Sequence, residues 1–167
     1  VISLVVDLDV GMMIETAMVG HDGVLNAASA LDAKVSLNKG IVQVAGSAGT
    51  VEVNRLRRLA NEFDPFRALL IRHEQVVLAQ SQQSAACNAS HSLGARMCRW
   101  LLYMRDLTAS DDLLLTQEFL AQMLGVRRTS VTIVASKLQK AGLIKYKRGH
   151  LHVLEVKGLE KGACECY

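Results

Sequence analysis

The sequence predicts an α+β protein with a β-rich first part, a long central helix and a largely helical C-terminal part. Three observations lead to this prediction. β-branched and apolar runs separated by turn residues fill the first third of the chain. Apolar and small side chains then recur in a 4-3 alternation between Phe66 and His91. Finally, two helical repeats flank Gly125 and precede a short alternating hairpin.

Residues 1–64 predict small antiparallel strands of the kind that build a β-roll. Turn residues, Asp9-Val10-Gly11 and Gly20-His21-Asp22-Gly23, separate the first runs. A helical turn is expected over Val24–Leu31 and a short helix over Asn54–Ala60. Because the chain opens with Val inside a strand-like run, we expect further strands to precede it. The predicted strands are Val1–Leu8, Met12–Val19, Gly40–Ala45 and Thr50–Val53.

Residues 65–91 predict one long helix. Pro65 suits the first helical position, and Asp64 before it suits the cap. The 4-3 alternation gives this helix a seam suited to packing against a second helix. The alternative is that the same face packs on the chain's own β-roll. The seam consists of Phe66, Leu70, His73, Val77, Gln80, Ser84, Cys87 and His91.

Residues 92–167 begin with a further predicted helix, starting near Ser92. A polar link over Asp106–Asp112 separates it from the next helix, which Thr116 can cap through its hydroxyl. Gly125 follows where a helix C-terminus favours a residue that tolerates positive φ. The apolar stripe of the helix after Ser92 consists of Leu93, Met97, Trp100, Leu101 and Met104.

A second helix begins three residues after Gly125, and Gly142 ends it. Its helical periodicity predicts a buried face made of Val131, Val134, Ala135 and Leu138. The opposite face carries Thr129, Thr132, Ile133, Ser136 and Lys140. Two alternating runs around Arg148-Gly149 then predict a hairpin. One face of this hairpin carries Ile144, Tyr146, Leu151 and Val153.

The same region is strongly basic. From Phe119 to Leu154 there is no Asp or Glu, but there are seven Lys and Arg, in a chain whose formal net charge is only +3. Such a local field favours a polyanionic partner. Helix, tight turn, helix and basic hairpin together make a winged helix-turn-helix, whose second helix fits the major groove of DNA.

The run TQEFLAQMLGVRRTSVT…LQKAGLIKYKRGHLHV resembles the C-terminal domain of the Crp/Fnr family of bacterial transcription regulators. The likeness extends, less specifically, through the long helix into a partial β-roll. It implies three regions: a partial β-roll sensor domain over 1–64, a dimerisation helix over 65–91 and a winged helix-turn-helix DNA-binding domain over 92–167. It also implies that Phe66, Leu70, His73, Val77, Gln80, Ser84 and Cys87 pair two subunits.

In this family the roll often holds a cyclic nucleotide through a Gly-Glu element and an Arg-Ser/Thr-Ala element. Here His21 follows Gly20 where the Glu is expected, and Lys34-Val35-Ser36-Leu37 lacks the second element. An imidazole cannot accept two ribose hydroxyl hydrogens as a carboxylate does. We therefore expect no cyclic nucleotide and no other cofactor, and the effector stays unknown.

The outward face of the second helix supplies the candidate base contacts. An Arg can bridge O6 and N7 of guanine, and the methyl groups of Thr and Ile can meet a thymine methyl. The base-contact candidates are Arg127, Arg128, Thr129, Thr132 and Ile133. The candidates for phosphate contact, which would position the protein without reading sequence, are Gln117, Ser130, Lys145, Lys147 and Arg148. The alternative for all of them is an ordinary solvated surface.

Other classes of function find little support. No phosphate loop, nucleophile elbow or zincin motif is present, and Asp7, Asp9 and Glu15 are interpreted as exposed hairpin charges, so we predict no enzyme. No apolar run approaches the roughly 18 residues that span a bilayer. Metal-ligand residue types do occur, but their spacing matches no common site, so no metal is predicted. They are His150, His152, Cys164 and Cys166.

The sequence thus predicts a cytoplasmic, sequence-specific DNA-binding regulator with reduced cysteines. The resemblance implies a homodimer on a two-fold operator of double-stranded DNA. RNA polymerase is a further candidate partner. The alternative is a ligand-binding or protein-interaction module whose helix-turn-helix contacts protein rather than DNA.

Overall fold

The N-terminal part is a three-stranded antiparallel sheet with one helical turn beside it. In the computed structural model, which describes residues 1–8, 11–31, 35–36 and 38–167, β1 (Ile2–Asp7) lies between β2 (Met13–Val19) and β3 (Lys39–Val42). The predicted first, second and third strands are therefore confirmed within a few residues. The 3-10 helix η1 (Ala27–Leu31) provides the expected helical turn. The turn residues Asp9 and Val10, and Lys34 and Leu37, lie outside the described residues.

The fourth predicted strand, Thr50–Val53, is wrong. Val53 is already the first residue of helix α1 (Val53–Glu62). The cause is local, because the Glu52 carboxylate accepts hydrogen bonds from the backbone N–H groups of Asn54 and Arg55, at 3.0 and 3.1 Å. This capping starts the helix before the β-branched residues can pair as a strand.

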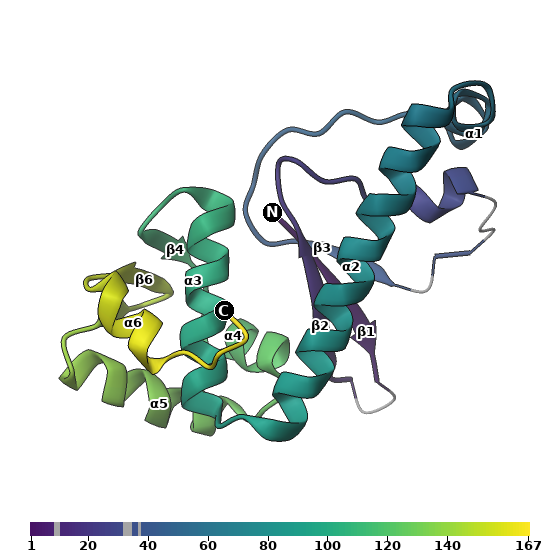
Figure 1. Cartoon of the computed structure of the whole chain (residues 1–167). Helices are drawn as coiled ribbons and strands as arrows, with labels where there is room; N and C mark the ends of the chain where they lie inside the picture. Colours follow the sequence, from purple (N-terminus) through teal and green to yellow (C-terminus); the bar gives the residue numbers. More distant parts are fainter. Residues whose placement is uncertain (9–10, 32–34, 37) are drawn as a thin grey trace.

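The long helix α2 (Asp64–Ser90) runs along the sheet and connects the two halves of the molecule (Figure 1). Pro65 lies in its first turn as predicted. Asp64 is not the cap, because it belongs to the first turn itself and Phe63 occupies the cap position. One face of α2 packs on the N-terminal part. Leu70 is buried with Ala27, Ala30 and Ala60, while Val77 packs on the sheet.

Helix α3 (Leu93–Thr108) opens the C-terminal part, and the Ser92 hydroxyl caps it by accepting from the Ala95 N–H at 3.3 Å. The helix continues to Thr108, so the expected polar link at Asp106–Asp112 is shorter than predicted. β4 (Asp112–Leu114) follows and pairs with β6, in a sheet of order β4-β6-β5. The remaining elements are α4 (Gln117–Leu124), α5 (Arg128–Lys140), β5 (Ile144–Lys147), β6 (His150–Val153) and α6 (Val156–Gly162).

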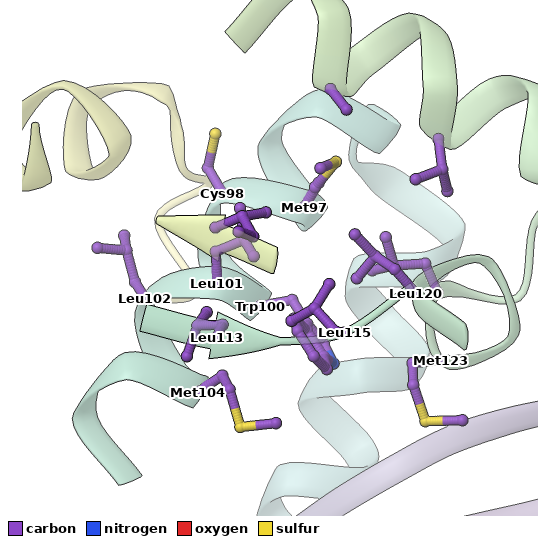
Figure 2. Close-up of a cluster of buried hydrophobic side chains, with 14 of the residues drawn as sticks. Met97, Cys98, Trp100, Leu101, Leu102, Met104, Leu113, Leu115, Leu120 and Met123 are labelled. Carbon is purple, nitrogen blue, oxygen red and sulfur yellow. The ribbon is translucent and has the colours of Figure 1, made fainter. Parts of the chain in front are cut away.

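The principal core lies around α3. Figure 2 shows Met97, Leu101, Leu113 and Leu120 converging from three elements of the C-terminal part. The same buried cluster includes Val5 and Met18 of the first sheet. Ile14 of β2 also lies beside Gly125 in the turn between α4 and α5. The N-terminal sheet and the helix-turn-helix therefore share one continuous apolar core.

Within the described residues, no helix combines the length and the apolar character needed to cross a membrane.

Candidate nucleic-acid interface

Helix α4 is built by local signals that the sequence shows clearly. The Thr116 hydroxyl accepts from the Phe119 N–H at 3.1 Å, which confirms the predicted N-cap. Gly125 ends the helix with a φ of 63°, a conformation that glycine adopts without steric cost. Leu120, Met123 and Leu124 are buried. α4 is thus a rigid support that fixes where α5 begins.

Helix α5 presents the predicted surface to solvent. Val131 and Ala135 are fully buried, and Val134 and Leu138 are half-buried, so the predicted inner face is confirmed. On the other side Arg127, Arg128, Thr129, Thr132, Ile133 and Lys140 are exposed. Ile133 is 59% exposed, a high value for a branched apolar side chain. The outward face of α5 is therefore free to meet a partner.

The two helices are also joined at this surface. The Thr132 hydroxyl donates to Gln117 Oε1 at 2.7 Å, which ties α5 to the first residue of α4. It also lies 3.1 Å from the Arg128 carbonyl oxygen. Gln117 and Ser130 are half-buried, and both lie near the entrance of α5. The structure thus brings Gln117 and Thr132, fifteen residues apart in sequence, into direct contact.

The hairpin of β5 and β6 forms the wing. Arg148 and Gly149 form its turn, both with positive φ, at 51° and 81°. Ile144, Leu151 and Val153 are buried and Tyr146 is half-buried, as predicted. The Tyr146 hydroxyl donates to the Leu115 carbonyl oxygen at 3.0 Å, and burial raises the pKa of Tyr146 to about 12. This contact holds the wing beside the start of α4, with Lys145, Lys147 and Arg148 at its surface.

The basic residues of this region carry uncompensated charge. In the part of the chain that the structure describes, none of the seven cations between Phe119 and Leu154 lies within ion-pair distance of a carboxylate. The pairs that do form involve Lys39, Arg105 and three histidines. The surface of α5 and the wing is therefore an exposed patch of one sign, as the sequence predicts.

The predicted dimer seam faces the chain's own N-terminal part and needs correction. Leu70 and Cys87 are buried within the subunit. His73 Nε2 accepts from the Val24 N–H, and Gln80 Oε1 accepts from the Met18 N–H, both at 3.1 Å. Six of the seam residues contact the rest of the same subunit, and Ser84 lines a hollow beside them; the six are Phe66, Leu70, His73, Val77, Gln80 and Cys87. The alternative interpretation, packing on the chain's own β-roll, describes this face.

A different part of α2 is apolar and open to solvent. Leu69, Val76 and Leu78 are each 57% exposed, and Ile71 is 39% exposed. They lie on two sides of the helix, because Leu69 and Val76 form one stripe and Ile71 and Leu78 form another on the roughly opposite side. The 4-3 pattern marked the inner face because the same spacing is needed whether a helix packs on its own sheet or on a second helix.

The interpretation of Glu15 as an exposed hairpin charge is also wrong. Glu15 is buried, and its carboxylate accepts from Trp100 Nε1 at 2.8 Å, from Gln43 Nε2 at 2.9 Å and from the Ser3 hydroxyl. Burial raises the pKa of Glu15 to about 7, while these hydrogen bonds lower it by a smaller amount. Simple alternation along β2 does not predict this position, because a bulge puts Glu15 opposite Val5 on the sheet face toward α3, whereas Ala17 pairs with Leu4 on the face toward α2.

The metal-capable residues noted in the sequence are not brought together as one group. His152 Nδ1 lies 2.7 Å from Asp112 Oδ1 on the neighbouring strand, and His150 is exposed at the wing. Cys164 and Cys166 meet Cys87 and His91 instead. Neither histidine of the wing belongs to that cluster.

A scan against protein families matches residues 95–161 to the Crp-like helix-turn-helix domain. Solved structures with the same fold include a Crp/Fnr family regulator from Thermus thermophilus, which has a TM-score of 0.72 and 21% identity, with 97% of this chain and 82% of that one covered. A second regulator of the Crp family from the same organism has a TM-score of 0.68 and 20% identity, with 99% of this chain and 86% of that one covered.

FixK2 from Bradyrhizobium japonicum has a TM-score of 0.71 and 13% identity, with 98% of this chain and 83% of that one covered. No curated protein sequence is significantly similar to the chain. The fold and the exposed basic surface define a winged helix-turn-helix protein with a β-roll and a long connecting helix. More particularly, residues 95–161 match the Crp-like helix-turn-helix domain, and the chain as a whole has the fold of Crp/Fnr family regulators, which agrees with the sequence resemblance.

Proposed function

We propose that this protein is a sequence-specific DNA-binding transcription regulator that acts as a homodimer on a two-fold operator. The observation that supports this most strongly is the outward face of α5. It is exposed, carries arginines at its start and an exposed Ile133, and lies among cations without carboxylate partners in the described part of the chain. A surface of this kind matches the chemistry of a DNA major groove.

Base contacts are assigned to the first turns of α5. Arg128 can donate two hydrogen bonds to O6 and N7 of a guanine, and Arg127 and Thr129 lie beside it. The Thr132 hydroxyl is already bonded to Gln117 Oε1 and lies close to a backbone carbonyl, so we assign its methyl group to a thymine methyl. Ile133, exposed next to it, extends this apolar contact.

Phosphate contacts are assigned to the edges of the surface. Because Gln117 Oε1 is engaged by Thr132, its side-chain amide remains as a donor toward phosphate. Ser130 lies at the entrance of α5, and the wing supplies Lys145, Lys147 and Arg148. The hydrogen bond from Tyr146 to Leu115 fixes the distance between the wing and α4, which defines the spacing of the phosphate contacts.

The dimer contact is assigned to the exposed side of α2. Leu69 and Val76, seven residues apart on one stripe of the helix, are large apolar side chains that water covers in the single chain. Exposed apolar residues concentrated on one element are typical of an association surface. Ala79 and Ala86 on the same side allow close approach of two helices.

We propose that the effector is not a cyclic nucleotide. His21 is exposed and follows Gly20 in the turn where the family has Glu. A hollow between η1 and α2 has Glu74 among its lining residues, and its described lining includes no Arg or Lys to neutralise a phosphate. These features favour a regulator whose signal differs chemically from a cyclic nucleotide.

The test compares three alanine variants on a specific duplex and on unrelated duplex DNA. We expect Arg128→Ala to weaken specific binding by about 1–3 kcal/mol and to relax preference at one base position. Lys147→Ala should weaken binding to all sequences alike. Arg58→Ala, which removes an exposed arginine from α1 far along the chain, should leave both affinities unchanged. Equal, sequence-independent losses from Arg128→Ala and Lys147→Ala would contradict the assignment of Arg128.

Salt dependence separates a DNA partner from a protein partner. Each neutralised phosphate contributes a slope of about −0.9 to the plot of log affinity against log salt concentration. Lys147→Ala should therefore make this slope shallower by about 0.9, the contribution of one phosphate contact. A protein partner would give a shallow slope that Lys147→Ala does not change.

A further inference from the structure

Four side chains of metal-ligand type meet where the chain ends. Cys87 and His91 lie one turn apart at the C-terminal end of α2, and Cys164 and Cys166 come from the segment after α6. Their ligand atoms all lie within 4.8 Å of one another. Cys87 and Cys164 are buried, while His91 and Cys166 are partly exposed. Residues more than 70 positions apart in sequence thus supply three thiols and one imidazole to one point.

Three of the six separations between these atoms match the edges of a tetrahedral site. The Cys87 and Cys164 sulfurs are 3.5 Å apart, His91 Nδ1 is 3.5 Å from the Cys87 sulfur, and it is 3.7 Å from the Cys166 sulfur. Zinc bonds of roughly 2.3 Å to sulfur and 2.0 Å to nitrogen imply tetrahedral edges of about 3.6–3.8 Å. An iron–sulfur cluster distributes its four ligands over two or more iron atoms, which requires wider spacing.

The surroundings of His91 supply an independent observation. Its Nε2 lies 3.1 Å from Glu165 Oε1, and Glu165 stands between the two tail cysteines in sequence. With Nε2 bonded to a carboxylate, Nδ1 is left as the lone-pair nitrogen, and it is the atom that faces the thiols. A carboxylate that orients a histidine in this way is a recurrent feature around protein-bound zinc.

The charge of the surroundings suits such a centre. Three thiolates with one divalent zinc carry a net charge of minus one, and Arg96 and Arg99 line the same hollow as Cys87. Arg99 also donates to the Cys166 carbonyl oxygen at 3.2 Å, and Gln83 donates to the Cys166 sulfur at 2.8 Å. Thiolate and imidazole ligands favour zinc over magnesium, calcium or manganese.

We propose that Cys87, His91, Cys164 and Cys166 bind a structural zinc ion that fastens the C-terminal tail to the end of α2. A disulfide between Cys87 and Cys164 is the alternative, since their sulfurs are neighbours. It would use only two of the four groups and would leave the placement of His91 and Cys166 without a cause. The zinc site uses all four and explains the position of Glu165 as well.

The consequence is mechanical. α6 and the tail belong to the C-terminal part, whereas Cys87 and His91 end the helix that connects both parts (Figure 1). A metal bonded to both fixes the angle between α2 and α3 at the junction before Ser92. Because binding free energy at a structural site adds to folding free energy, metal removal also lowers the stability of the chain.

The test measures metal directly on the 167-residue chain, without DNA, so it is independent of the proposed function. After purification under reducing conditions with zinc supplied, elemental analysis should find about one zinc per chain. Reconstitution with Co²⁺ should give the visible and near-ultraviolet absorption of tetrahedral cobalt with thiolate ligands. A chain that takes up neither metal, or that shows a Cys87–Cys164 disulfide in reduced preparations, would overturn the proposal.

Matched variants locate the ligands. Cys166→Ser should lose bound zinc and the thiolate-to-cobalt absorption, whereas Cys98→Ser, which changes a buried cysteine of α3 outside the cluster, should keep both. Glu165→Gln should weaken zinc affinity by about 10–100-fold and leave the stoichiometry at saturating zinc unchanged. Equal metal content and equal cobalt spectra in Cys166→Ser and the unsubstituted chain would refute the assignment.

Discussion

Glu15 shows how one buried side chain connects the two parts of the molecule. It stands on β2, yet it accepts a hydrogen bond from Trp100 on α3, and Gln43 and Ser3 complete its surroundings. The carboxyl group is held largely away from water, which disfavours its charged form. The contact between the N-terminal sheet and the winged helix-turn-helix part is thus sensitive to one titration near neutral pH.

The titration of Glu15 makes stability depend on pH in a defined direction. Its pKa is about 7 in the folded chain, against an ordinary value of 4.5. Between these values the unfolded chain has released the proton while the folded chain still binds it, so stability falls as pH rises and levels off above the folded pKa. The shift corresponds to a loss of about 3 kcal/mol.

Glu15→Gln should remove this dependence while keeping the shape of the side chain. We expect the unfolding free energy of the variant, relative to the unsubstituted chain, to be about 2–3 kcal/mol more favourable at about pH 8 than at about pH 5. Any change in hydrogen-bond quality is common to both conditions and cancels. Urea unfolding of both proteins at the two pH values measures this, and an identical difference at both would contradict it.

At the scale of elements, the turn between α4 and α5 is the tightest constraint on the site. Gly125 has a φ of 63°, and a Cβ there would lie 3.1 Å from Ile14 Cδ1 of β2. Gly125→Ala should therefore lower the unfolding free energy by about 1–2 kcal/mol. Gly46→Ala is the matched control, because a methyl group added there would meet nothing within 4 Å and its φ is not positive. Equal stability of the two variants would refute the constraint.

The exposed side of α2 yields a prediction about assembly. Val76→Glu places a charge in the proposed dimer contact and should raise the dissociation constant of the dimer by about 10-fold or more, because the buried carboxylate would lack a partner. Thr50→Glu adds the same charge to an exposed connection and should not change it. Sedimentation over a range of concentrations measures both, and an unchanged dimer in Val76→Glu would exclude this face.

Elements with strong local signals could be predicted from the sequence, and those that depend on distant contacts could not. Thr116, Gly125 and the periodicity of α5 encode the helix-turn-helix within a few residues of each part. The inner face of α2 was visible as a pattern, but its partner was not, because the chain's own sheet and a second helix require the same spacing. Glu52 likewise changed an expected strand into the start of a helix through two hydrogen bonds.

On the scale of the whole molecule, the candidate surface could be predicted but its setting could not. The exposure of Arg128, Thr132 and Ile133 follows from the helical wheel alone. The shared core that joins Val5 and Met18 to the C-terminal part depends on tertiary packing. The meeting of Cys87 with Cys164 depends on it as well. We propose that a signal in the roll shifts the position of α5 through this shared core, as a change in population between two arrangements.

The most direct test of the central claim, that the exposed face of α5 reads bases in a two-fold operator, is selection of bound sites from random duplex DNA by the dimeric protein. The account predicts an enriched inverted repeat whose half-sites lie about one helical turn apart. It further predicts that Arg128→Ala loses preference at the same position of each half-site. Recovery of no common sequence, or of one without two-fold symmetry, would contradict it.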